Sequence, residues 1–232
     1  MEKDELISRS PLRAFMNAIQ GGLKNGELGI IAAPSGIGKT SVLVQIALDK
    51  LLRGKKVIHI SFTQHTDYVL TWYENIFDEF IRKKNLENPQ EIKDDIFKNR
   101  VLMKFTQGGL SWEQILRSVR ALIKDGGFAA NNIIVDGYIF TGTDKDWLTG
   151  VKAFAREMDI SFWFSCTVKG TEPLYDKRNI PVVIKDYADL FDVIIILKAK
   201  PDNITLTVSK DRDNYNLENL ALKLDPKTLL IQ

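Results

Sequence analysis

Short apolar runs recur along the chain and alternate with stretches of helical periodicity. Leu28 to Ala33 is a continuous apolar run of strand length. A glycine turn separates it from Lys39 to Leu52, where apolar residues recur at the spacing of a helix packed on a sheet. The pattern therefore predicts a strand, a loop and a helix in succession.

The same alternation continues through the middle of the chain. Further buried strands are expected at Lys56 to Phe62, Val101 to Phe105, Ile133 to Val135 and Ile160 to Phe164. A helix is expected from about Asp146 to Met158. Another helix would place on one face Val69, Trp72, Tyr73, Ile76, Phe77, Phe80 and Ile81. Strands that alternate with helices predict an α/β fold with a mainly parallel sheet.

The C-terminal part of the chain has a different pattern. Short apolar segments lie at Val193 to Leu197, Ile204 to Val208, Leu220 to Leu224 and Leu229 to Ile231. The last three leave no room for helices between them, so they predict an antiparallel extension of the sheet. No repeat or linker-like stretch divides the chain, and we expect one domain over residues 1–232, with about 1–20 as an N-terminal lead-in.

Composition is that of a globular protein, with 44% hydrophobic and 27% charged residues. The formal net charge of +2 gives no general reason to expect nucleic acid or a membrane surface as a partner. A single cysteine, Cys166, excludes an internal disulfide, and the N-terminal MEKDELISRS lacks the apolar core of a secretory signal. No apolar run is long enough for a membrane helix. These features predict a cytoplasmic protein.

The strongest chemical signal is the octet APSGIGKT, which starts at Ala33. It fits the P-loop pattern, except that alanine stands at the opening glycine position. A glycine-bearing loop can turn its backbone N–H groups toward the dense negative charge of a polyphosphate, where larger side chains would obstruct it. The residues expected to bind the nucleotide are Pro34, Ser35, Gly36, Ile37, Gly38, Lys39, Thr40 and Ser41.

Each polar residue of this loop has an expected role. The Lys39 ammonium would contact the β and γ phosphates, and the Thr40 hydroxyl would bind magnesium. The N-terminus of the following helix adds a partial positive charge. The alternative is a glycine-rich turn with an ordinary surface lysine, but the position between a strand and a helix favours the P-loop.

A carboxylate at the end of a buried strand should complete the metal site. The run NIIVD ends in Asp136, which we expect to hold the water shell of the magnesium ion. An aspartate after a strand is also a common turn former. The P-loop upstream favours the metal-site interpretation.

Several stretches of the chain resemble a known protein family. The run GGLKNGELGIIAAPSGIGKTSVLVQIA, from Gly21 to Ala47, resembles the ATPase core of the RecA superfamily, particularly KaiC-like ATPases and DnaB-type replicative helicases. Looser similarity continues through VIHISF, NIIVDG, FWFSC, DYADLFDVIIIL and VSKDRDN, over about residues 10–232. The resemblance implies a RecA-like fold that binds ATP and Mg²⁺, without the N-terminal helical domain of replicative helicases.

The catalytic carboxylate of that family is missing here. Relatives carry a glutamate just beyond the second strand, where it polarises the attacking water. This chain has Thr63 and Gln64 instead. Gln64 would orient a water by hydrogen bonding but cannot accept a proton as a carboxylate does. His65 is an alternative base, although a single loop histidine is more often a bystander. We expect slow or absent hydrolysis.

The resemblance also suggests a residue that acts on a neighbouring subunit. In relatives, a basic residue, one spacer and an arginine reach the nucleotide of the next subunit, and Lys210 and Arg212 match that spacing. A guanidinium suits phosphate because it makes two parallel hydrogen bonds. The alternative is an exposed basic pair at the end of a strand. If the role holds, the protein is a head-to-tail homo-oligomer.

The segment from Lys169 to Asp186 corresponds to loops that contact DNA in RecA-like rings. Its charges are mixed, with Lys169, Lys177, Arg178 and Lys185 among Glu172, Asp176 and Asp186. Binding of nucleic acid by this loop is therefore one hypothesis, and a solvated loop or a protein-binding surface is the favoured alternative.

Cys166 lies at the position where helicase relatives carry a residue that senses the γ-phosphate. We expect a small buried thiol there, and Ser165 or Thr167 would take the sensing role instead.

Three functions remain open. We favour a nucleotide-gated oligomeric regulatory or assembly protein of KaiC-like type, with weak or absent hydrolysis. The second is a DNA-dependent ATPase, a recombinase or helicase core. The third is a degenerate RecA-like scaffold that acts through protein contacts, against which Lys39, Thr40 and Asp136 argue because packing alone does not require them. The fold does not choose among biological processes.

Overall fold

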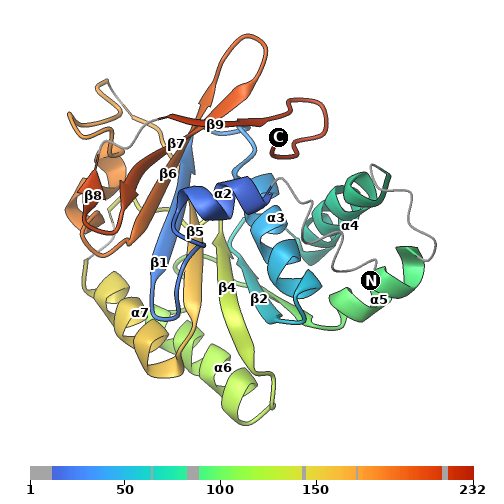
Figure 1. Ribbon diagram of the computed structural model, residues 1–232. Coiled ribbons are helices and arrows are strands. Elements are labelled where there is room, and N and C mark those ends of the chain that lie inside the picture. The colour runs from blue at the N-terminus through green and yellow to red at the C-terminus, as the bar shows by residue number, and fades with distance from the viewer. Residues whose placement is uncertain (1–11, 64, 83–88, 143–144, 171, 216–218) are drawn as a thin grey trace.

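The structure, a computed structural model, describes residues 12–63, 65–82, 89–142, 145–170, 172–215 and 219–232. In these residues one mixed, mostly parallel sheet lies between helices on its two faces (Figure 1). The α/β class and the antiparallel C-terminal strands predicted from the sequence are confirmed.

The central part of the sheet is parallel. The described strands follow the order β3-β2-β4-β5-β1-β6-β7-β8, and β9 also pairs with β7. Pairings from β3 to β6 are parallel, whereas those of β7 with β6, β8 and β9 are antiparallel. The strands are β1 Leu28–Ala33, β2 Lys56–Ser61, β3 Arg100–Lys104, β4 Ala130–Asp136, β5 Ser161–Thr167, β6 Val193–Ala199, β7 Ile204–Asp211, β8 Asn214–Tyr215 and β9 Asn219–Leu224.

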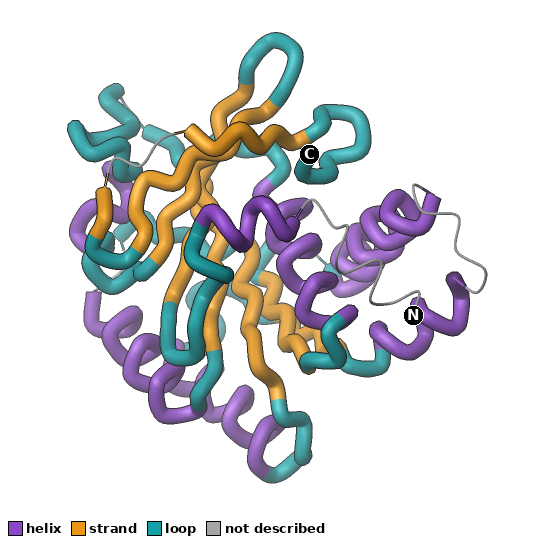
Figure 2. Tube along the Cα trace, viewed as in Figure 1, coloured by secondary structure: helices purple, strands orange, loops and turns teal. Residues whose placement is uncertain are grey.

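Each face of the sheet has its own helices and its own apolar core. Figure 2 shows the helices in purple on either side of the orange strands. One core includes residues of α2 Leu12–Ala18, α3 Lys39–Leu52, α4 Thr66–Arg82 and α5 Pro89–Phe97. The other includes residues of α6 Trp112–Lys124, α7 Lys145–Met158 and the 3-10 helix η1 Val182–Tyr187.

The middle position of β1 explains its sequence. Every residue of β1 is buried, because β5 and β6 flank it and both faces of the sheet are covered. A strand of this kind needs apolar side chains on both faces, so its sequence is a continuous apolar run and not an alternation. The strand and helix predicted on either side of the glycine turn have the bounds of β1 and α3.

Two parts of the fold differ from expectation. Helix α6 was not foreseen, although Ser111 and Gln114 form a capping box that the sequence carries as Ser-x-x-Gln. Leu229 to Ile231, predicted as a strand, forms only an isolated bridge between Leu224 and Ile231. The reason is a tight turn before it, in which the Leu229 N–H donates to the Asp225 carbonyl at 2.7 Å and Asp225 Oδ1 accepts the N–H groups of Lys227 and Thr228 at 2.7 and 3.1 Å.

A histidine lies inside the core under α4. His59 of β2 is fully buried, and its Nδ1 lies 3.1 Å from the Tyr73 hydroxyl. Its Nε2 has no hydrogen-bond partner within the described part of the chain. Burial lowers the pKa of His59 to about 4, although the charge of Asp136 raises it in part. The ring is therefore neutral near pH 7.

Stability should fall as acid charges this ring. The folded-state pKa of about 4 is below the ordinary 6.5, so the folded state binds fewer protons between these two pH values. We expect the free energy of unfolding to be unaffected by His59 above pH 6.5 and to fall by on the order of 3 kcal/mol toward pH 4. Denaturant titrations of wild type and His59→Asn across this range measure the difference. Parallel pH profiles would contradict the assignment.

Candidate functional site

The glycine loop that joins β1 to α3 has the backbone of an anion cradle. Gly36 and Gly38 have φ values of 78° and 90°, which side chains rarely tolerate. Gly38 is also tightly enclosed, because a Cβ there would lie 2.5 Å from Leu224 Cδ2. As the N-cap of α3, Gly38 provides no side-chain cap for the first N–H groups of the helix. These donors and the helix dipole suit a phosphate group.

The side chain of Lys39, the first residue of α3, folds back over this loop. Its ammonium donates hydrogen bonds to the carbonyl oxygens of Pro34, at 2.8 Å, and Ala33, at 3.2 Å. Burial lowers its pKa, while the charge of Asp136 acts in the opposite direction. A partly buried ammonium gains more from an anion than an exposed one does.

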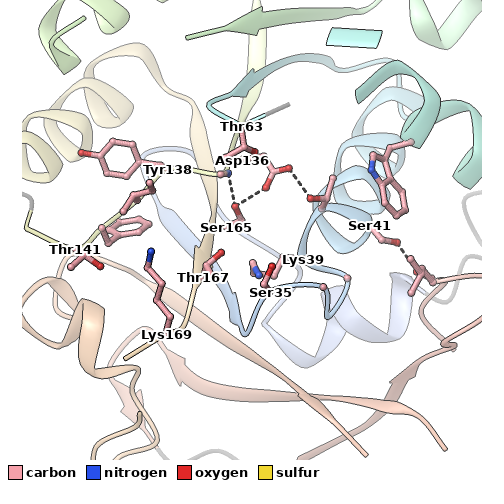
Figure 3. A pocket seen from close by; sticks show the side chains of 18 residues that line it. Ser35, Lys39, Ser41, Thr63, Asp136, Tyr138, Thr141, Ser165, Thr167 and Lys169 are labelled. Atoms are coloured by element: carbon pink, nitrogen blue, oxygen red, sulfur yellow. Dashed lines mark hydrogen bonds between the residues drawn. The ribbon is translucent and has the colours of Figure 1, made fainter. Parts of the chain in front are cut away.

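Asp136 connects the loop to the neighbouring strands. It ends β4 and is 4% exposed. Thr40 Oγ donates to one carboxylate oxygen at 2.8 Å, and Ser165 Oγ of β5 donates to the other at 2.6 Å. The Gly137 N–H in turn donates to Ser165 Oγ at 2.8 Å. Both residues predicted to hold the metal are thus in direct contact (Figure 3).

A cavity of about 470 Å³ opens over these residues. Its walls come from the glycine loop, the end of β4 with residues 137–141, and the end of β5 with Thr167 and Lys169. Trp72 of α4 and Leu229 of the C-terminal turn also line it. The volume is that of a small-molecule site.

The C-terminal turn forms a wall that the sequence did not reveal. Ser41 Oγ and Gln45 Nε2 donate to the Leu229 carbonyl at 2.6 and 2.9 Å. Ser41, which was expected to bind phosphate, therefore has its hydroxyl committed to this turn. The only signal in the sequence is that two polar residues, Ser41 and Gln45, lie on the buried side of α3. Their acceptor, Leu229, is 188 residues away from Ser41.

The stretch where a catalytic glutamate was expected is only partly described. Gln64 lies outside the described residues, and His65 is exposed just before α4. Thr63 lines the cavity beside Gly137, where a Cβ would lie 2.4 Å from Thr63 Oγ1. Gly137, with φ of 81°, thus makes room for Thr63. Among the described residues that line the cavity, Asp136 is the single carboxylate.

Lys210 and Arg212 lie away from this cavity, on β7 and just after it. They do not form the exposed basic pair that was the alternative prediction. Lys210 is 5% exposed, and its ammonium donates to the Ala188 carbonyl at 2.8 Å. Burial lowers its pKa, and the charge of Asp189 raises it in part.

All the N–H groups of Arg212 are directed into its own chain. Nε and Nη2 donate to the two carboxylate oxygens of Glu27 at 3.1 and 2.7 Å. Nη1 donates to Ile19 O at 3.1 Å and to Asp211, and Nη2 also donates to Gly22 O at 2.7 Å. Its side chain is 16% exposed. This network favours a structural role for Arg212, and its action on a neighbouring subunit stays a prediction.

The loop expected to face nucleic acid is partly built into the protein. Asp176 Oδ1 accepts the N–H groups of Arg178 and Ile180 at 2.9 and 2.8 Å, and η1 packs into the core below α7. Before the loop, Cys166 is buried, and burial raises the pKa of its thiol to about 12. Its predicted character as a buried thiol fits this geometry, and Ser165 makes the contact to the metal-site carboxylate.

Two further findings concern metal ligands and membrane-spanning helices. Within the described ranges, no group of three or more His, Cys, Asp or Glu side chains is placed to hold a metal ion. A divalent ion at Thr40 and Asp136 would therefore share its ligands with a phosphate, as magnesium commonly does. Of the helices in the described part of the chain, none has the length and apolar character to span a bilayer.

Comparison with known proteins adds no information about the site. The chain matches no protein-family model, and no curated protein is significantly similar to it.

Replacing Arg212 should test its structural role. Arg212→Ala would leave the buried Asp211 and the nearly buried Glu27 without their shared cation, and we expect a loss of roughly 3 kcal/mol in the free energy of unfolding. The matched control is Arg82→Ala, whose exposed pair with Glu79 should cost less than about 0.5 kcal/mol. Denaturant unfolding measures both. Equal, small losses would instead favour a free, trans-acting arginine.

Proposed function

We propose that this protein binds ATP with Mg²⁺ in the cavity between the glycine loop and Asp136. We further propose that it is a RecA-like, KaiC-like nucleotide-gated regulatory or assembly protein with weak or absent hydrolysis. The observation that carries the proposal is the convergence of Lys39, Thr40, Asp136 and Ser165 at one end of the sheet.

The residues present fit a polyphosphate. Gly36 and Gly38 hold the loop open, and Lys39 supplies a cation beside the first N–H groups of α3. Magnesium, when bound, would neutralise phosphate charge. Thr40 and Asp136 are the residues that would hold it, and Ser165 keeps the carboxylate oriented.

The set of acids supports slow turnover. Water attack on the terminal phosphate needs a group that orients the water and accepts its proton. Among the described cavity residues the single carboxylate is Asp136, and both of its oxygens already accept hydrogen bonds from Thr40 and Ser165. Thr63, just after β2, can orient a water but is a poor proton acceptor.

The topology supports the RecA-like part of the proposal. The glycine-loop strand β1 and the Asp136 strand β4 are separated by β5, and antiparallel strands extend the sheet beyond β6. A mainly parallel sheet with such C-terminal strands is what the resemblance of Gly21 to Ala47 implies. That resemblance is also the basis on which we propose assembly into an oligomer, in which ATP occupancy would act by ordering a subunit interface.

Nucleotide binding should depend on the loop cation and the metal-site carboxylate. Lys39→Ala is expected to weaken ATP binding by about a hundredfold, and Asp136→Asn to weaken its magnesium dependence. Calorimetry with and without Mg²⁺ measures both. Lys200→Ala, which changes an exposed lysine on the β6-β7 turn, is the control and should bind as wild type. Unchanged binding in Lys39→Ala would sink the proposal.

Hydrolysis should be gained by adding a carboxylate to the cavity wall. Thr63→Glu places a proton acceptor on a residue that lines the cavity, so phosphate release should rise roughly tenfold or more. Thr63→Gln, of similar size but without the charge, should stay at the wild-type rate. Gln64→Glu tests the neighbouring position in the same assay.

The rate of ATP hydrolysis by the wild-type protein tests the proposal of slow turnover directly. We expect turnover well below roughly 1 per second. A faster rate would contradict slow hydrolysis, and release that single-stranded DNA stimulates would favour a DNA-dependent ATPase instead.

A further inference from the structure

Lys169 continues a row of side chains that leads from the sheet core into the cavity. Successive side chains of a strand point to opposite faces. Along β5 and just beyond it, Ser165, Thr167 and Lys169 line the cavity, whereas Cys166 and Val168 belong to the apolar core on the other face. The alternation of β5, which ends at Thr167, thus continues as far as Lys169.

The end of β5 is fastened to the glycine loop. Thr167 is in register with Ala33, and the Val168 N–H donates to the Ala33 carbonyl at 2.9 Å. The same carbonyl accepts the Lys39 ammonium at 3.2 Å. The Lys39 ammonium and the backbone N–H just before Lys169 thus share one acceptor, the Ala33 carbonyl.

The strand order sets what Lys169 faces. Because β5 lies between β1 and β4, its end lies between the glycine loop and Asp136. In Figure 3, the side chain of Lys169 extends beside Thr167 toward the loop that carries Tyr138 and Thr141. In the proposed nucleotide complex, the terminal phosphate lies between Lys39 and the metal site.

The charges of the cavity leave Lys169 available for an anion. The cations that line the cavity in the described part of the chain are Lys39 and Lys169, and the anion is Asp136. Lys39 is held by two carbonyl oxygens. Lys169 is exposed, and no other described residue forms a hydrogen bond or ion pair with its ammonium.

The cation expected from a neighbouring subunit is meanwhile engaged elsewhere. Arg212 donates to Glu27, Asp211 and two backbone carbonyls within its own chain. Lys210 is buried against Ala188. Neither side chain is free to bind a phosphate without breaking these contacts.

We propose that Lys169 supplies, from the same chain, the second cation that binds the terminal phosphate, so that the site prefers a nucleoside triphosphate to a diphosphate. The inference rests on the proposed nucleotide binding at the glycine loop. Lys169 contacts only the phosphate that the diphosphate lacks, whereas Lys39 serves both ligands. A protein gated by ATP occupancy needs such a preference, because a ligand shifts an equilibrium only through differential affinity.

The test compares two ligands on the full chain in the presence of magnesium. The ligands are ADP and the ATP analogue in which an imido group replaces the β,γ-bridging oxygen, which excludes hydrolysis. Lys169→Ala should weaken binding of the analogue about tenfold and binding of ADP by less than about twofold. Lys169→Arg should retain most of the preference, and salt should reduce it. Lys200→Ala should leave both affinities unchanged.

The outcomes separate this inference from the function on which it rests. If wild type binds neither ligand, the proposed nucleotide site fails. If wild type binds both and Lys169→Ala weakens both equally, or neither, the role of Lys169 is overturned while the site stands. Loss of single-stranded DNA binding with an unchanged nucleotide preference would also overturn it and assign Lys169 to nucleic acid.

Discussion

The hydrogen bonds of the Asp136 carboxylate are the interaction on which the candidate site depends. One oxygen accepts from Thr40 at the start of α3, and the other accepts from Ser165 in β5. The carboxylate is 4% exposed, so these bonds offset much of the cost of burying a charge. Through Asp136, the glycine loop and two further strand ends are held in one geometry.

Around this centre, the protein closes its site with segments that are distant in sequence. The C-terminal turn accepts hydrogen bonds from Ser41 and Gln45, and Leu224 lies against Gly38. These contacts join the glycine loop and the helix that follows it to the C-terminal turn and β9.

The distribution of cations separates binding from support. Arg212 and Lys210 stabilise the junction of β7 with the N-terminal segment and with Ala188. Lys39 and Lys169 face the cavity. A basic residue in a motif-like position thus has its role set by the acceptors around it, and those acceptors, such as Glu27 and Ile19 O, lie nearly 200 residues earlier in the chain.

The sequence by itself determined the α/β class, the bounds of β1 and α3, and the pairing of a glycine loop with Asp136, because these depend on local periodicity and on one short motif. It did not reveal α6, whose capping box was the available signal. It also did not reveal the turn at Leu229, the partners of Arg212 or the direction of Lys169. Those features were decided only by the tertiary structure, because contacts between segments far apart in sequence choose which polar groups are satisfied inside the protein and which remain for a ligand.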